Sequence, residues 1–163
     1  MILRKLKTED APLMLEWMHD TSVVEHLGTN FAEKSLDDCR RFINWANDTD
    51  TDLHLAVADE NDTYMGTVSL KHIDRTAKTA EFAITVRACA MGQGYSRFGM
   101  EHILEMGIHE MGLDTIYWCV NPINARAVRF YDKCGYQRTQ AIPQALLALY
   151  KDLPADLIWY QYQ

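Results

Sequence analysis

The middle of the chain combines a strand-like hydrophobic pattern with two short polar turns. Three runs have the composition of strands, 53–58, 64–73 and 79–86, and the turn-rich segments 59–62 and 74–78 join them. Consecutive strands joined by tight turns pair as antiparallel hairpins. The sequence therefore predicts an antiparallel meander at the centre of the fold.

Helical and strand-like segments alternate on both sides of this meander. Apolar residues recur at helical spacing in 8–18, 36–46, 92–111 and 124–133, and further strands are predicted at 2–7, 115–120, 136–142 and 157–162. Residues 143–154 indicate no more than a loop with a short apolar turn. This order predicts a mixed sheet with helices on its faces, an α+β (mixed α/β) fold.

Length and composition limit the kind of protein this is. The 163 residues are enough for one domain with a sizeable core, so we expect a single domain over 1–163. No apolar run approaches the roughly 20 residues of a membrane span, and the N-terminus lacks the pattern of a signal peptide. We therefore expect a cytoplasmic protein without a membrane partner.

Cysteine, histidine and overall charge exclude several kinds of site. The four cysteines show no CxxC spacing, and the six histidines, His54 and His72 among them, show no metal-ligand spacing. We expect reduced thiols, structural or solvent-facing histidines and no metal. Sixteen basic residues against 23 acidic ones give a formal charge of −7, which argues against nucleic acid as a partner.

A glycine-containing loop lies between a predicted strand and a predicted helix. It reads Met91-Gly92-Gln93-Gly94-Tyr95-Ser96. Glycines let a ligand approach the backbone closely, and free N–H groups at a helix N-terminus bind phosphate. The loop lacks the Lys-Ser/Thr ending of a P-loop and the glycine spacing of a dinucleotide fingerprint. A turn that only leads into the helix is the alternative interpretation.

A second stretch, 124–136, identifies a family when it is taken together with this loop. Asn124, Ala127, Tyr131, Gly135 and Tyr136 fit the pattern Asn-x-x-Ala-x-x-x-Tyr-x-x-x-Gly-Phe, with Tyr in place of the final Phe. The chain resembles the acetyl-CoA-dependent GNAT N-acetyltransferases, in particular the branch that includes ribosomal-protein N-terminal acetyltransferases. The resemblance implies a three-layer fold, with a mostly antiparallel twisted sheet and helices on both faces.

The resemblance also implies which residues bind acetyl-CoA. The residues expected to contact this cosubstrate are Ile84, Thr85, Val86, Met91, Gly92, Gln93, Gly94, Tyr95, Ser96 and Asn124. Those of the loop would bind pyrophosphate through backbone amides, since Met91 replaces the family's Arg or Gln and Ser96 its last small residue. The strand end would pair with the pantetheine arm, and Asn124 would hydrogen-bond to it. A plain helix N-cap is the alternative role of Asn124.

Two residues are implied as catalytic. Tyr131 would protonate the departing CoA thiolate, and Glu81 would accept the proton of the attacking amine, directly or through water. Strand alternation places Glu81 on the face opposite to Phe82 and Ile84. The alternatives are a core tyrosine on an amphipathic helix and a solvated or ion-paired carboxylate on a strand.

The expected function is direct acetyl transfer to a primary amine. The acceptor would be a small molecule, such as an amino sugar, or a protein N-terminus, and no motif selects between them. A homodimer through an exposed strand or helix is compatible with the family. The alternative function is a non-catalytic module that binds or senses acyl-CoA. Charge is uneven, because 47–63 contains acidic residues without Lys or Arg whereas 121–138 is locally basic, as suits a phosphorylated cosubstrate.

Overall fold

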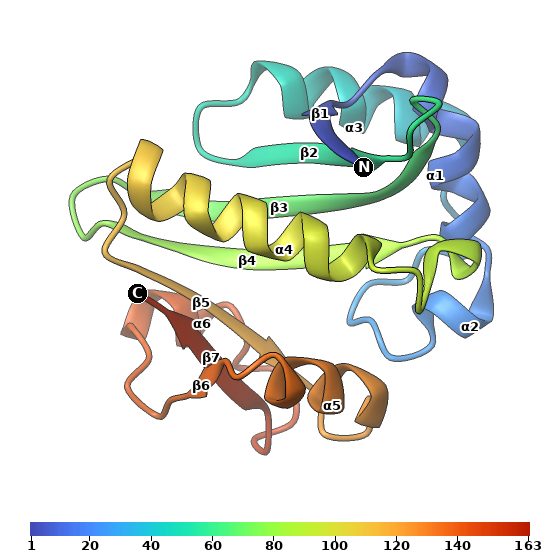
Figure 1. Cartoon of the computed structure of the whole chain (residues 1–163). Helices are drawn as coiled ribbons and strands as arrows, with labels where there is room; N and C mark the ends of the chain where they lie inside the picture. The colour runs from blue at the N-terminus through green and yellow to red at the C-terminus, as the bar shows by residue number, and fades with distance from the viewer.

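The computed structural model describes residues 1–163, and a seven-stranded sheet runs through it (Figure 1). The strands are β1 Ile2–Lys5, β2 Leu53–Ala58, β3 Tyr64–Asp74, β4 Thr79–Val86, β5 Thr115–Val120, β6 Gln137–Arg138 and β7 Ile158–Tyr162, in the order β1-β2-β3-β4-β5-β7-β6. All neighbouring strands are antiparallel except β4 and β5, which are parallel. The predicted meander is confirmed as β2, β3 and β4.

Helices cover both faces of the sheet. The helices are α1 Ala11–Met18, α2 Thr21–Val24, α3 Leu36–Asp48, α4 Tyr95–Glu105, α5 Ala125–Lys133 and α6 Gln144–Ala148. In Figure 1, α4 crosses in front of β3 and β4, whereas α1 and α3 pack on the opposite face. This arrangement confirms the predicted mixed fold with three layers. No helix is both long and apolar enough to cross a membrane.

Two apolar clusters lie on the two faces of the sheet. One joins α4 to the strands and contains Val68, Phe82 and Met100, while the other joins α1 and α3 to the strands and contains Met14 and Ile43. Gly99 allows α4 to lie close to the sheet, because a Cβ there would be 2.7 Å from Cγ2 of Val57. The sheet is therefore buried on both sides, and its strand ends are held at fixed positions.

Local sequence signals explain where the helices begin. The Ser35 hydroxyl accepts from the N–H of Asp38, and the Asp38 carboxylate accepts from the N–H of Ser35, which makes a capping box for α3. Asn124 caps α5, since its Oδ1 accepts from the N–H of Ala127 at 3.2 Å. Both starts agree with the sequence-based prediction.

Several predicted boundaries were wrong. The helix expected over 92–111 starts at Tyr95, because Gly92 and Gly94 adopt φ of 73° and 89°, and it continues as a π-helical turn over Met106–Glu110. The strand expected over 136–142 comprises only Gln137–Arg138, since this edge strand pairs with β7 alone. The short helix α2 was missed because it offers too few turns for a hydrophobic period to show, whereas α6 corresponds to the short apolar turn expected within 143–154.

Candidate active site

Strands β4 and β5 diverge partway along their length. Their pairing stops at Glu81 and Tyr117, although β4 continues to Val86 and β5 to Val120. Beyond this point β5 pairs with β7 only. The edge of β4 that would face β5 is therefore unpaired from Phe82 to Val86, and Figure 1 shows the two strands separating toward the ends where α4 and α5 begin. An unpaired strand edge offers hydrogen bonds to an extended ligand.

Free amides gather beside the end of β4. Within residues 91–98, the N–H groups that make no backbone hydrogen bond are those of Gly92, Gly94, Tyr95, Ser96 and Arg97. They belong to the turn before α4 and to its first helical turn, where the helix dipole also favours negative charge. The positive φ at Gly92 and Gly94 shapes this turn. The segment can therefore bind a phosphate or pyrophosphate through its backbone, whereas the Met91 side chain packs into the core.

Tyr131 lies on α5 and packs toward β5. Its ring centroid is 5.6 Å from that of Trp118 and 5.2 Å from that of Tyr160. Burial raises the pKa of Tyr131 above its ordinary value, and no hydrogen bond contributes to the shift. The buried Nε1 of Trp118 also lacks a hydrogen-bond partner. The hydroxyl of Tyr131 therefore stays protonated at neutral pH.

Glu81 occupies the last paired position of β4 with β5. It is only 3% exposed, so a solvated carboxylate is wrong, whereas the alternative of an ion-paired carboxylate agrees with its contact to Lys71. The Tyr150 hydroxyl donates to its Oε1, Lys71 Nζ lies 3.6 Å from Oε1, and His72 Nε2 lies 3.5 Å from Oε2. Burial raises the pKa of Glu81, and the charges of Lys71 and His72 oppose this shift. Tyr150, which was not predicted as a site residue, reaches Glu81 from the segment after α6.

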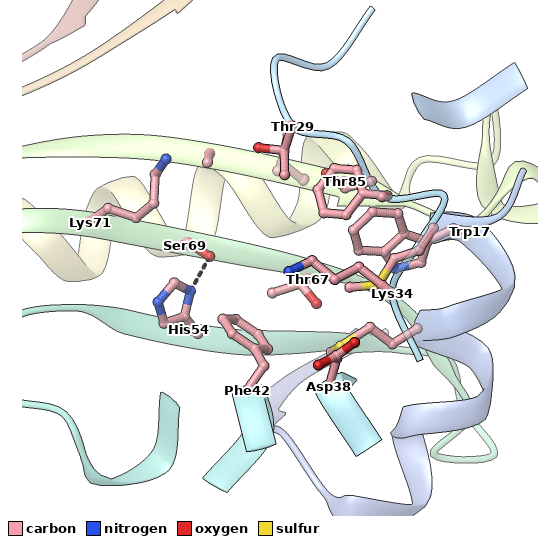
Figure 2. A pocket seen from close by; sticks show the side chains of 15 residues that line it. Trp17, Thr29, Lys34, Asp38, Phe42, His54, Thr67, Ser69, Lys71 and Thr85 are labelled. Atoms are coloured by element: carbon pink, nitrogen blue, oxygen red, sulfur yellow. Dashed lines mark hydrogen bonds between the residues drawn. The ribbon is translucent and has the colours of Figure 1, made fainter. Parts of the chain in front are cut away.

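A cavity of about 370 Å³ lies on the face of the sheet that α1 and α3 cover. Its apolar wall includes Met14, Trp17, Met18, Phe31 and Phe42, and its polar lining includes Lys34, Asp38, His54, Thr67, Ser69, Lys71 and Thr85 (Figure 2). The lining also reaches Ala83 and Ile84 of β4. One edge of this strand pairs with β3, and the opposite edge faces the gap beside β5. A ligand in the cavity and a ligand between the strands would thus meet at β4.

The polar lining of the cavity was not predicted as a site. From the sequence, His54 was expected in a structural or solvent-facing role, and no role was expected for Ser69 or Lys71. The hairpin register brings these residues together, with His54 opposite Ser69 and Lys71 opposite Glu81. Counting outward from the turn at 74–78 could have indicated the pair Lys71–Glu81, whereas the register shift between Val57 and Ala58 hides the pair His54–Ser69 from such a count.

These features define a class of protein. An unpaired strand edge that ends at free backbone amides suits an extended, phosphorylated carrier, and the adjoining cavity suits a second small substrate. The partly buried phenol of Tyr131 on α5 and the buried titratable groups His54 and Glu81 on the strands are residue types that serve in acid–base catalysis. The fold and site together are those of an acyltransferase that takes its acyl group from a coenzyme A thioester.

Comparison with protein families identifies the class more closely. Residues 1–137 match the family model described as acetyltransferase (GNAT) domain, and the chain belongs to this family. The chain is an N-acetyltransferase, and its acetyl donor is acetyl-CoA. The resemblance to the GNAT N-acetyltransferases inferred from the sequence is thereby confirmed, and the branch within the family stays a prediction.

Individual relatives are distant. The chain is 23% identical over 141 residues to a Bacillus licheniformis protein named uncharacterized N-acetyltransferase p20, across 83% of this chain and 78% of that protein. It is 26% identical over 103 residues to spermidine N(1)-acetyltransferase of Vibrio cholerae, across 63% of this chain and 60% of that one. A crystal structure of Vibrio cholerae spermidine N-acetyltransferase with CoA and spermine has a TM-score of 0.76 at 22% identity, covering 85% of this chain and 81% of that one.

Proposed function

We propose that residues 1–163 form one acetyltransferase domain that acetylates the primary amine of a small molecule bound in the cavity beside β4. The observation that carries this proposal is the position of the cavity. Its lining includes Ala83, Ile84 and Thr85, which belong to the segment of β4 that is left unpaired on the edge toward β5. An amine in the cavity therefore lies next to a thioester held along that edge.

The donor is held mainly by backbone groups. The free edge at Ile84, Thr85 and Val86 pairs with the pantetheine arm, and the free amides of Gly92, Gly94, Tyr95 and Ser96 bind the pyrophosphate. The loop also presents the backbone of Met91 and the exposed Gln93 to the donor. Oδ1 of Asn124 caps α5, which leaves its Nδ2 to donate to the arm.

The chemistry is direct transfer. The amine nitrogen attacks the thioester carbonyl, whose oxygen is polarised by a backbone N–H near Val86, and the carbon–sulfur bond breaks. Tyr131 gives its proton to the departing thiolate and regains one from solvent. Glu81 accepts a proton from the bound ammonium, directly or through water. Its environment supports this role, because burial disfavours the ionised carboxylate and so raises its proton affinity.

The lining of the cavity favours an acceptor with one amine on an apolar body. Aromatic and methionine side chains form the wall on the side of α1 and α3. The ammonium of Lys34 has no carboxylate partner, whereas Asp38 pairs with Arg41 and Lys71 lies near Glu81. Figure 2 shows Lys34 and Lys71 entering the cavity from different sides. These two cations disfavour a polyamine, although spermidine acetyltransferases are among the relatives.

An acetyl-transfer screen tests the proposal. The purified protein is given acetyl-CoA with an arylalkyl monoamine, an amino sugar, spermidine or a peptide with a free N-terminus, and thiol release is followed with a thiol-reactive dye. We expect release well above hydrolysis with the monoamine, and a mass increase of one acetyl group in the product. Binding of acetyl-CoA without transfer to any amine would instead support the non-catalytic binding module.

A further inference from the structure

A chain of three polar side chains runs along the sheet wall of the cavity. His54 Nδ1 lies 2.6 Å from the Ser69 hydroxyl oxygen, and His54 Nε2 lies 3.2 Å from Oδ2 of Asp52. The relative exposure of His54 is 6% and that of Ser69 is 5%, and both line the cavity (Figure 2). The three residues therefore form a hydrogen-bonded series that runs from the partly exposed Asp52 through the buried His54 to the buried Ser69 at the substrate space.

The direction of each hydrogen bond follows from the groups involved. A carboxylate only accepts hydrogen bonds, so Nε2 of His54 carries a proton and donates a hydrogen bond to Asp52. In the neutral ring Nδ1 is then an acceptor, and the Ser69 hydroxyl donates to it. The lone pairs of the Ser69 oxygen that remain are free to accept from a donor in the cavity. An amine N–H is such a donor.

The surroundings keep the imidazole neutral until a proton arrives. Rings of Phe42 and Trp45 from α3 lie with centroids 5.1 Å and 5.4 Å from that of His54. Burial lowers the pKa of His54, the charge of Lys71 on β3 lowers it further, and Asp52 before β2 opposes both. Lys34 and Asp38 are the other charged residues of the cavity lining, and Asp38 is paired with Arg41.

We propose that Ser69 and His54 carry a proton away from the acceptor nitrogen during acetyl transfer, with Asp52 as a positioning residue. This inference rests on the proposed function. The nitrogen enters as an ammonium and ends as an amide, so it loses two protons as it gains the acetyl group. Glu81 accepts one. For the other, the nitrogen gives its proton to the Ser69 oxygen while the Ser69 hydroxyl proton moves to His54 Nδ1.

The relay is restored after each turnover. Asp52 stabilises the imidazolium through its bond to Nε2, as a carboxylate beside a protonated histidine does. When the amide leaves the cavity, the proton passes from His54 back through Ser69 to solvent. The proton that Tyr131 gives to the thiolate is separate, so the overall reaction yields one amide, one thiol and one proton.

The Ser69→Ala variant tests the relay with the smallest structural change. We expect kcat at pH 7 to fall about 10²-fold, at the lower end of the range of general acid–base catalysis, while the Kd for acetyl-CoA stays close to wild type. The melting temperature should fall slightly, because Nδ1 of the buried His54 loses its partner. The defect should shrink as pH rises toward 9.5, because hydroxide then accepts the proton. His54→Gln should show the same pH-dependent defect, and Asp52→Asn a smaller one.

His102→Gln is the matched control for the histidine variant. His102 lies on α4, on the other face of the sheet, where its Nδ1 contacts the Phe98 carbonyl oxygen at 2.8 Å. We expect wild-type kinetics from it. Wild-type kcat in Ser69→Ala, or a defect of equal size at every pH, would overturn the relay while the wild type still transfers acetyl groups. A wild type that acetylates no amine would overturn the proposed function and the relay together.

Discussion

Replacing Tyr131 by Phe separates the chemistry of its hydroxyl from the packing of its ring. The ring contacts Trp118 and Tyr160, and Phe keeps those contacts. No hydrogen bond of the hydroxyl contributes to the raised pKa of Tyr131, so its removal should leave no buried group without a partner. We therefore expect the free energy of unfolding to change by no more than about 0.5 kcal/mol, as for a substitution that breaks no structural feature.

The expected loss of activity is much larger. Without the phenol the CoA thiolate departs unprotonated, and a positioned general acid contributes roughly 10²- to 10⁴-fold in rate. A fall of about 10²-fold in kcat corresponds to about 2.7 kcal/mol of barrier. Because burial raises the pKa of Tyr131, the wild-type acid keeps its proton throughout the neutral and mildly alkaline range. Deprotonation of Tyr131 should therefore not lower the rate of the wild type at any pH up to about 9.

The assay compares steady-state thiol release with acetyl-CoA binding by calorimetry. Tyr136→Phe is a matched control, since Tyr136 also packs on Trp118, at 5.2 Å, and burial raises its pKa to about 12. We expect the control to keep wild-type kcat and both variants to keep the Kd for acetyl-CoA. Equal turnover by wild type and Tyr131→Phe would refute the assignment of this acid.

Three further outcomes are expected. Glu81→Gln should lower kcat/KM and remove the decline of kcat/KM at acid pH. Because the pKa of Glu81 is raised by folding, its ionisation weakens folding, so the melting temperature of this variant relative to wild type should rise with pH. A difference in melting temperature that stays constant with pH would contradict this. Gly94 has a φ of 89°, and Gly94→Ala should raise the KM for acetyl-CoA about 10-fold, because roughly one charge-assisted hydrogen bond is lost. Gly112 has a φ of 72° but lies outside the site, so Gly112→Ala should lower only the stability. Spermidine should be a poorer acceptor than an arylalkyl monoamine, and Lys34→Gln should narrow the difference; a preference for spermidine in the wild type would refute the charge argument.

Much of the fold and the donor side of the site follows from local sequence. The turns at 59–62 and 74–78 require hairpins, the glycines before α4 require a turn with positive φ, and Asn124 is suited to cap α5. These signals act over a few residues, so one sequence reveals them. Edge elements were predicted less well. The strand β6 is short because its length depends on a single neighbour, β7, far along the chain.

The acceptor side depended on tertiary structure. Sequence alternation indicated which face of β4 carries Glu81, but not that Tyr150, 69 positions away, donates to it, nor that burial raises its pKa. It also left His54 without a role, because the contact with Ser69 depends on the register of β2 on β3. The sequence by itself therefore determined the family, through its motifs, and the meander and the glycine turn before α4, through local backbone preferences. The burial, proton affinity and grouping of the acceptor-side residues depend on which strands and helices pack together, and only the tertiary structure decided them.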